Sequence, residues 1–138
     1  MFSDADIKDI LSTVKTIALV GASDKEDRPS NEVMHFLQRQ GYRILPVNPR
    51  LAGTVIHGEP VFAELEDITE PVDMVDVFLN ASLVEPIAES AVRIGAKVFW
   101  TQKGVINETA NHTAKAAGLK VVYNRCPKEE LPRLGMLK

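Results

Sequence analysis

The sequence predicts an α/β fold in which helices flank a doubly wound, mostly parallel sheet within a single domain. Short apolar segments alternate along the chain with amphipathic segments of helical spacing, a pattern typical of right-handed βαβ crossovers. The first apolar segment ends at Gly21, and a helix start follows near Pro29, as in Rossmann-like folds. A chain of 138 residues is large enough to bury one hydrophobic core.

The first element predicted is a helix near the N-terminus. Ser3 followed by Asp6 resembles a capping box, and four apolar residues then recur at helical spacing: Ile7, Ile10, Leu11 and Val14. The run TIALVG at 16–21 is a short continuous apolar strand, as expected when helices cover both faces of a parallel sheet. We expect residues 1–15 to form a helix that packs on the single domain made by residues 1–138.

Pro29 suits the first turn of the second helix, which Gly41 ends. The inner face of this helix carries Val33, Met34 and Leu37. YRILPVNP at 42–49 is predicted as the second strand. The glycine-punctuated stretch 51–68 is predicted as a loop with a short strand near 60–62.

The second half continues the alternation. VDMVDVFL at 72–79 is a third strong strand, and residues 84–92 form an amphipathic helix with Pro86 in its first turn. AKVFWT at 96–101 is the next strand, with Trp100 expected in the core. Asn107 can cap a helix that Gly118 closes. LKVVYN at 119–124 is the last strand, and a short helix is expected from residue 128 onward.

Composition narrows the classes of function. The net charge of −3 lacks the basic excess of a nucleic-acid binder. The N-terminal MFSDADIKDIL contains acids and no long apolar run, so neither a signal peptide nor a membrane span is predicted. Cys126 is the one cysteine and cannot form an intramolecular disulfide, which suits a reducing compartment. We therefore expect a cytoplasmic protein with no nucleic-acid or membrane partner.

The first candidate binding segment is GASDKEDRPS, which follows the first strand. Gly21 permits a tight turn, and the backbone N–H groups of Ala22, Ser23 and the residues after them can face a phosphate. The helix that begins at Pro29 adds a favourable dipole. Lys25 or Arg28 can add a full positive charge; an ordinary strand-to-helix turn is the alternative.

Two further strand ends should converge there. The second strand ends in Asn48-Pro49-Arg50, where an NAD-binding domain usually has an acid for the ribose hydroxyls. Asn48 and Arg50 would instead accept a phosphorylated ribose, although a proline-stiffened turn with an exposed arginine is the alternative. A later strand ends in Thr101-Gln102-Lys103, and Gly104 permits close approach of a ligand to the backbone.

The sequence offers little evidence for a catalytic site or a metal site. Its histidines fall at unrelated places, in a helix, in the long loop and in a later helix: His35, His57 and His112. None has a partner at metal-ligand spacing, so no metal site is predicted. Arg125 and Lys128 can lower the pKa of the Cys126 thiol, but a buried structural cysteine is the favoured interpretation.

Two carboxylates share the third strand. Asp73 and Asp76 lie three residues apart, so their side chains point to opposite faces and cannot form an acid/base pair. We expect Asp73 to cap the start of the strand and Asp76 to accept backbone hydrogen bonds near its end. No catalytic residue is predicted.

Seven ordered segments, IALVGAS, RPS, GYRILPVNP, PVDMVDVF, IGAKVFWTQKGV, AGLKVV and RCPK, carry a family resemblance over about residues 16–128. The chain resembles the stand-alone CoA-binding domain proteins and the N-terminal domain of the succinyl-CoA synthetase alpha subunit. The resemblance implies a Rossmann-like fold that surrounds coenzyme A or acyl-CoA. It places Gly21, Ala22 and Ser23 at the phosphates and Pro49 and Arg50 near the adenosine 3′-phosphate.

The same resemblance implies that Thr101, Gln102 and Gly104 line the opposite wall. Phe78 either packs on the adenine or belongs to the core. In the synthetase a lysine follows the proline of the second strand, whereas this chain has Arg50-Leu51, which leaves the identity of the positive group open.

A binding fold does not establish catalysis. The resemblance implies that ligase activity needs an active-site histidine and an ATP-grasp partner, which we do not find in this sequence. We therefore expect a non-catalytic or regulatory protein that binds the small-molecule cofactor. Two alternatives stay open: an enzyme that uses NAD(P) or another nucleotide, and an interaction module for a partner subunit.

Overall fold

The computed structural model describes residues 2–138, and the first element begins where the capping box predicts. Ser3 Oγ accepts from the Asp6 N–H and the Asp6 carboxylate accepts from the Ser3 N–H. The helices are α1 (Asp4–Thr13), α2 (Pro29–Arg39), α3 (Glu85–Arg93), α4 (Glu108–Ala116) and α5 (Pro127–Arg133), with short 3-10 helices η1 (Leu65–Asp67) and η2 (Ala81–Leu83). The strands are β1 (Thr16–Val20), β2 (Arg43–Val47), β3 (Val55–Ile56), β4 (Glu59–Pro60), β5 (Met74–Val77), β6 (Val98–Thr101) and β7 (Lys120–Val122).

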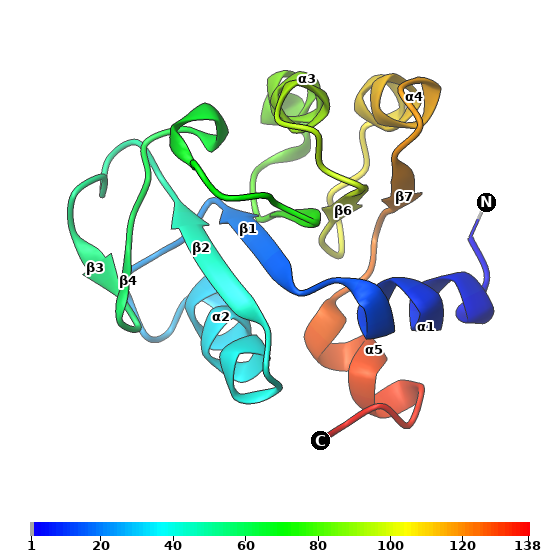
Figure 1. The fold of residues 1–138 in the computed structure, drawn as a ribbon, viewed down its shortest axis with the longest axis horizontal. Coiled ribbons are helices and arrows are strands. Elements are labelled where there is room, and N and C mark those ends of the chain that lie inside the picture. The colour runs from blue at the N-terminus through cyan, green and yellow to red at the C-terminus, as the bar shows by residue number, and fades with distance from the viewer. Residues whose placement is uncertain (1) are drawn as a thin grey trace.

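Five parallel strands form the main sheet in the order β2-β1-β5-β6-β7. The chain moves from β1 outward to β2, then returns past β1 to β5 and continues outward on the other side. Strand order therefore reverses between the neighbours β1 and β5, which is where open α/β sheets bind ligands. A two-stranded hairpin of β3 and β4 lies beyond the edge strand β2 (Figure 1).

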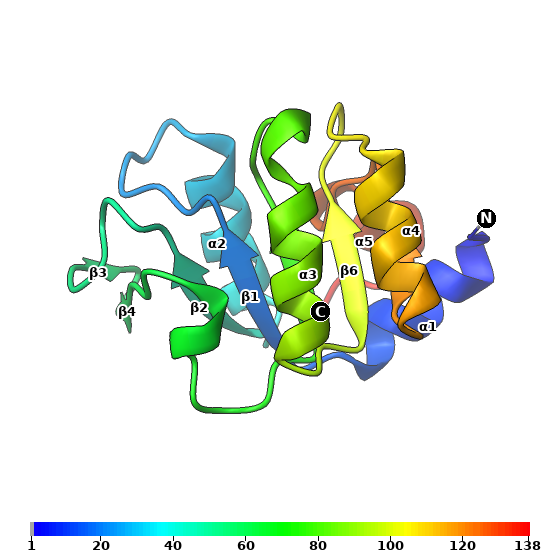
Figure 2. The same ribbon diagram turned by 90° about the horizontal axis from the view of Figure 1, so that it is seen from above.

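Helices cover both faces of the sheet. Helices α1, α2 and α5 pack on one face, and α3 and α4 cover the other, as Figures 1 and 2 show. Each face has its own core cluster: the first contains Leu37, Trp100 and Leu131, the second Val75 and Phe99. Because both faces are covered, β1, β5 and β6 are almost continuously buried, which explains why their sequences are apolar except at Thr16, Asp76 and Thr101.

The two faces are not covered equally. On the face of α3 and α4, no long helix lies over β2, and η1 with its connecting segments lies on this side of the sheet (Figure 2). None of the helices within the described residues has the length and apolar character that a bilayer-spanning segment requires.

Candidate functional site

The carboxyl ends of β1 and β5 meet at Gly21. Its φ of 90° lies in the region that favours glycine. A Cβ at this position would lie 2.5 Å from the carbonyl oxygen of Phe78, the residue that follows β5. The N–H groups of Gly21 and Ala22 both donate to the Val47 carbonyl at the end of β2. Gly21 thus lets three strand ends come together.

Those two hydrogen bonds change the expected phosphate contacts. Because the amides of Gly21 and Ala22 already bind Val47, a phosphate must find its donors further along the loop, beginning with Ser23. Arg28 is the N-cap of α2 and makes no side-chain capping bond, with Pro29 at the first helical position. Pro29 has no N–H, and the Asn31 and Glu32 N–H groups donate to the Arg28 carbonyl. Among the first residues of α2, the Ser30 N–H is therefore the one left for an anion at this helix start.

Two asparagines hold the loop between β1 and α2. The Asn48 amide donates to the Ala22 carbonyl at 2.8 Å, and its oxygen accepts from the Arg50 N–H at 2.9 Å. On the other side, the buried Asn31 donates to the Ser23 carbonyl at 2.9 Å, and its oxygen lies 2.8 Å from His57 Nε2. The loop is therefore fixed to β2 through Asn48 and to the β3–β4 hairpin through Asn31.

Two cavities flank this loop. The first, here called the α3 cavity, has a volume of about 690 Å³ and lies between the β2 end, η1 and α3. The second, called the α5 cavity, has a volume of about 470 Å³ and lies between the start of α2, the β6 end and the start of α5. Gly21 and Leu79 line both cavities, so the two cavities are adjacent.

The α3 cavity combines apolar walls with two arginines. Leu65, Leu79 and Ile87 supply apolar surface, and Arg50 and Arg93 supply positive charge. As the sequence indicates, no acid stands at the end of β2. A phosphorylated sugar next to Asn48-Pro49-Arg50 would meet a cation and no carboxylate at that strand end.

Gln102 and Cys126 line the α5 cavity, together with an ion pair. Lys103 Nζ lies 3.1 Å from Glu129 Oε1 at this cavity. Burial raises the pKa of the Cys126 thiol, although the backbone N–H groups of Lys128 and Glu129 oppose the shift. The raised pKa disfavours the thiolate form, as expected of a buried structural cysteine.

Gln102 is held by the carboxyl group of Asp76. The Gln102 amide donates to Asp76 Oδ1 at 2.7 Å, so the expectation that Asp76 accepts backbone hydrogen bonds is corrected to a side-chain partner. Asp76 is fully buried, and burial raises its pKa to about 7. Asp73 directly precedes β5, but its Oδ2 accepts from the Lys15 and Thr16 N–H groups at 2.9 and 3.0 Å, so it caps the start of the neighbouring strand β1 and not, as expected, of its own strand.

The structure distributes the predicted site residues unevenly. Asn48, Pro49 and Arg50 line the α3 cavity; Ser23, Arg28, Pro29, Phe78 and Gln102 line the α5 cavity; Gly21 lines both. Phe78 therefore lies on the α5 side of the loop, away from Arg50. Four predicted residues line neither cavity: Ala22, Lys25, Thr101 and Gly104.

Three of those four have structural contacts. Ala22 is buried and presents its carbonyl to Asn48. Thr101 is fully buried, and its hydroxyl donates to the Val105 carbonyl at 2.8 Å. The Gly104 N–H donates to Asn124 Oδ1 at 2.8 Å. Lys25 is exposed on the loop.

Sequence reasoning missed the far end of the α3 cavity. Glu66 from η1 and Arg93 from the end of α3 form an ion pair there at 2.8 Å, beside Ser90. The two residues are 27 positions apart and belong to no strand end. A cation at the last turn of an amphipathic helix is an ordinary feature, so the sequence carried no signal that would single out Arg93.

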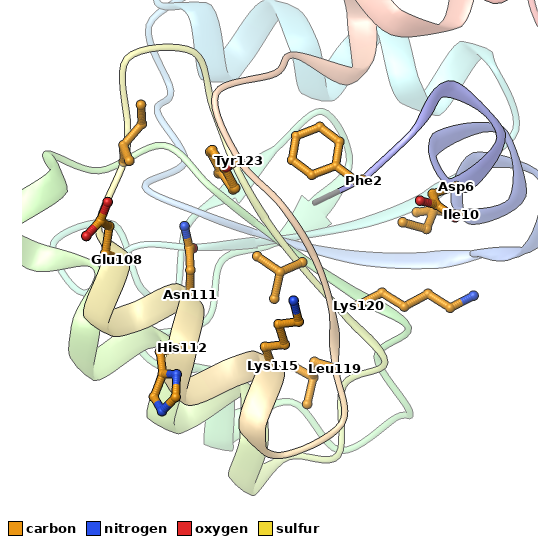
Figure 3. Close-up of a pocket in the computed structure, with 12 residues that line it drawn as sticks. Phe2, Asp6, Ile10, Glu108, Asn111, His112, Lys115, Leu119, Lys120 and Tyr123 are labelled. Atoms are coloured by element: carbon orange, nitrogen blue, oxygen red, sulfur yellow. The ribbon is translucent and has the colours of Figure 1, made fainter.

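A third cavity lies away from these strand ends, at the free edge of β7 (Figure 3). The rings of Phe2 and Tyr123 meet edge-on at a centroid distance of 5.2 Å, and α4 supplies a wall that includes Asn111. Its volume is about 540 Å³. Because ligands of open α/β sheets bind beyond the carboxyl ends of the strands, we place the candidate site at the α3 and α5 cavities.

Within residues 2–138, no three His, Cys, Asp or Glu side chains converge as metal ligands would. The two cavities are lined by apolar side chains, the amides of Asn48 and Gln102, three arginines, Lys103 and three glutamates.

Comparison with known proteins identifies the family of this chain. A family model described as CoA binding domain matches residues 15–132. The Bacillus subtilis (strain 168) protein YneT, described as uncharacterized, is 39% identical over 126 residues, which cover 91% of this chain and 92% of that protein.

Solved structures agree in fold. Prb, a PH1109 protein redesigned for binding, matches with a TM-score of 0.95 at 38% identity, covering 100% of this chain and 96% of that chain. The structure of cell-free ID.343 from Thermus thermophilus matches with a TM-score of 0.92 at 38% identity, covering 96% of this chain and 99% of that chain. The predicted α/β fold with a parallel sheet flanked by helices is confirmed.

Proposed function

Because the chain belongs to the CoA binding domain family, we propose that it binds coenzyme A, free or acylated, across the loop between β1 and α2. The observation that carries this proposal is the pair of cavities that share Gly21 and Leu79. Coenzyme A has a 3′-phosphorylated adenosine at one end, a pyrophosphate in the middle and a pantetheine arm at the other end. Its shape therefore suits two cavities joined at an anion-binding loop.

The polar groups suit the same ligand. In the proposed complex the 3′-phosphate lies near Arg50, and the adenosine occupies the α3 cavity. The pyrophosphate lies at Ser23 and the start of α2, and Arg28 adds charge at this point. The pantetheine arm enters the α5 cavity toward Gln102 and Cys126.

The role we propose is binding, in a sensing or regulatory capacity, rather than catalysis. The thiol at the end of the α5 cavity has a raised pKa, and the amide of Gln102 cannot transfer a proton. The carboxyl group of Asp76 is fully buried and accepts a hydrogen bond from Gln102. The side chains at this end are therefore suited to contact a ligand without reacting with it.

The test is calorimetric titration with coenzyme A and with 3′-dephospho-CoA. We expect coenzyme A to bind at least tenfold more tightly, since a hydrogen-bonded charged pair contributes about 1.5 to 3 kcal/mol. Arg50→Met should weaken coenzyme A binding to the level of the dephosphorylated ligand. It should leave the affinity for 3′-dephospho-CoA nearly unchanged.

Arg39→Met is the matched control, because Arg39 is an arginine of α2 that lines neither cavity. This variant should keep the preference for the 3′-phosphate. Equal affinity of the unaltered protein for both ligands would remove the argument from Arg50. Tighter binding of NADH than of coenzyme A would replace the proposal with a dinucleotide-binding function.

A further inference from the structure

The end of the α3 cavity beyond the apolar walls carries a fixed carboxylate. Arg93 donates from Nε and Nη2 to Oε2 of Glu66, at 3.1 and 2.8 Å. Arg93 Nη2 also lies 3.0 Å from Ser90 Oγ, one turn earlier on α3. Both arginine bonds end on the same carboxylate oxygen, Oε2, so Oε1 makes no bond to Arg93.

Glu66 is anionic at neutral pH. Partial burial alone would raise its pKa, but the hydrogen bonds from Arg93 and Ser90 outweigh burial and lower the pKa below its ordinary range. An ionised carboxylate accepts hydrogen bonds and donates none. This end of the cavity therefore favours a ligand group that carries N–H donors.

The second carboxylate of the cavity is differently engaged. The Glu64 N–H donates to Asp67 Oδ2 at 3.2 Å, and the Asp67 N–H donates to the backbone carbonyl of Glu64 at 3.1 Å. Arg93 pairs with Glu66 and not with Glu64. Of the two carboxylates, Glu66 is therefore the one that α3 holds in place.

The apolar walls between Arg50 and Glu66 suit a planar base. Leu65 and Ile87 line the cavity with Leu79 and Leu83, and none of the four offers a side-chain hydrogen bond. A nucleoside with its 3′-phosphate at Arg50 would place its base between these side chains. The outer edge of the base would then meet Glu66.

On these grounds we infer that Glu66, positioned by Arg93 and Ser90, accepts a hydrogen bond from the 6-amino group of adenine and makes the α3 cavity selective for adenine. The inference rests on the proposed function, since it assumes that the nucleoside end of coenzyme A lies in this cavity. Adenine carries an amino donor at this position, whereas hypoxanthine and guanine carry a carbonyl oxygen. A carbonyl oxygen facing a carboxylate would leave both groups unpaired and repel.

The experiment compares adenosine 3′,5′-bisphosphate with purine riboside 3′,5′-bisphosphate, which has hydrogen in place of the 6-amino group. Calorimetric titration of the unaltered protein should show about a tenfold preference for the adenosine compound. Glu66→Ala should reduce this preference to about onefold. Glu64→Ala, the matched control, should keep it.

Arg93→Met tests the positioning role. This variant leaves the carboxylate in place but frees it to turn, so the preference for the amino group should fall while binding of purine riboside 3′,5′-bisphosphate changes little. A preference unchanged in both Glu66→Ala and Arg93→Met would overturn the inference. So would equal affinity of the unaltered protein for the two bisphosphates.

The outcome is separable from that of the proposed function. If coenzyme A binds and its 3′-phosphate contributes, but the two bisphosphates bind equally, then only the role of Glu66 fails. If coenzyme A itself does not bind, the proposed function fails and the inference fails with it. Both Glu66 and Arg93 are partly exposed, at 37% and 59% of their side chains, so these variants should fold.

Discussion

Asp76 is a carboxyl group with no access to water in the middle of the sheet. One oxygen accepts from Gln102, and the other, Oδ2, is buried without a hydrogen-bond partner in the described part of the chain. Burial raises the pKa of Asp76 to about 7. In the unfolded chain the same group titrates near its ordinary value of about 4, so its protonation is linked to folding.

The sign of this linkage leads to a prediction for Asp76→Asn. Between about pH 4 and pH 7 the folded protein binds more protons at this site than the unfolded chain. The contribution of Asp76 to stability is therefore greatest below pH 4 and is lost as the pH rises through 7. Urea unfolding should find the variant more stable than the unaltered protein at pH 8, by up to a few kcal/mol, and nearly equal at pH 4.5.

Asp73→Asn is the control of opposite sign. Partial burial opposes ionisation of Asp73, but hydrogen bonds from the Thr16 and Lys15 N–H groups outweigh it and lower its pKa. Its stabilising effect is present above its unfolded pKa and lost as the pH falls through the folded value. This variant should thus lose stability at pH 8, and an equal gain in both variants would contradict the assignment for Asp76.

Single residues also mark the limit of what the sequence could predict about the site. Gly21, Asn48, Pro49 and Arg50 follow strands, and the topology of a parallel sheet brings strand ends together whatever the loops do. Arg93 reaches the same cavity from the far end of a helix, and only the packing of α3 against η1 decides that. Residues at strand ends were thus predictable, whereas those at the cavity walls required the three-dimensional arrangement.

At the scale of elements, β1 and β5 approach each other because one residue has no side chain. The Phe78 N–H donates to the Val20 carbonyl at 2.8 Å, which continues the ladder of β1 and β5 past its last paired residues. Gly21 follows directly, and a Cβ at this position would lie 2.5 Å from the Phe78 carbonyl oxygen. The turn that leads to the binding loop therefore depends on contact between two backbones.

We predict that Gly21→Ala is far more damaging than alanine at other glycines of positive φ. Gly95 has a φ of 77° and open space around its Cβ direction, so Gly95→Ala should cost only about 1 to 2 kcal/mol for its backbone conformation. Gly21→Ala adds a backbone clash that separates β1 from β5. Urea unfolding should show the larger loss for Gly21→Ala, and titration should show no coenzyme A binding.

Similar losses in the two variants would mean that conformation alone, not the approach of Phe78, requires glycine at position 21. Retained coenzyme A binding in Gly21→Ala would show that the loop tolerates displacement of the strand end.

The regular elements were predictable because their sequences agree with their surroundings. Buried strands are mainly apolar, and helix starts carry Ser3, Pro29 and Asn107 in their expected positions. The β3–β4 hairpin was predicted only as a loop with a short strand near 60–62. Its turn places His57 at a φ of 46°, and histidine is a much weaker signal for such a turn than the usual Asn-Gly or Asp-Gly.

At the scale of the whole molecule, the two faces of the sheet are covered by different means. Helices α3 and α4 follow the crossover order, whereas the opposite face is completed by α1 and α5, which come from the two ends of the described chain. Figure 1 shows α1 at the β7 side of the molecule, far from β2. We therefore expect the stability of the fold and the binding of the ligand to depend on different regions of the molecule.

This separation can be tested with Ile10→Ala. Ile10 is 2% exposed and belongs to the core cluster of the α1 face, and removing such a side chain costs about 2 to 4 kcal/mol. Lys8→Ala, an exposed change on the same helix, is the control and should cost little. Urea unfolding should give a lower midpoint for Ile10→Ala with an unchanged slope, because the unfolding remains cooperative.

Coenzyme A affinity should be the same in both variants at temperatures where they are folded. The ligand would contact the ends of β1, β2, β5 and β6 in the α3 and α5 cavities, and Ile10 lines neither cavity. A loss of affinity in Ile10→Ala that exceeds the fraction unfolded would show that the α1 face and the binding loop are coupled. The sheet would then transmit strain from its β7 side to its β2 side, rather than acting as a rigid support for the site.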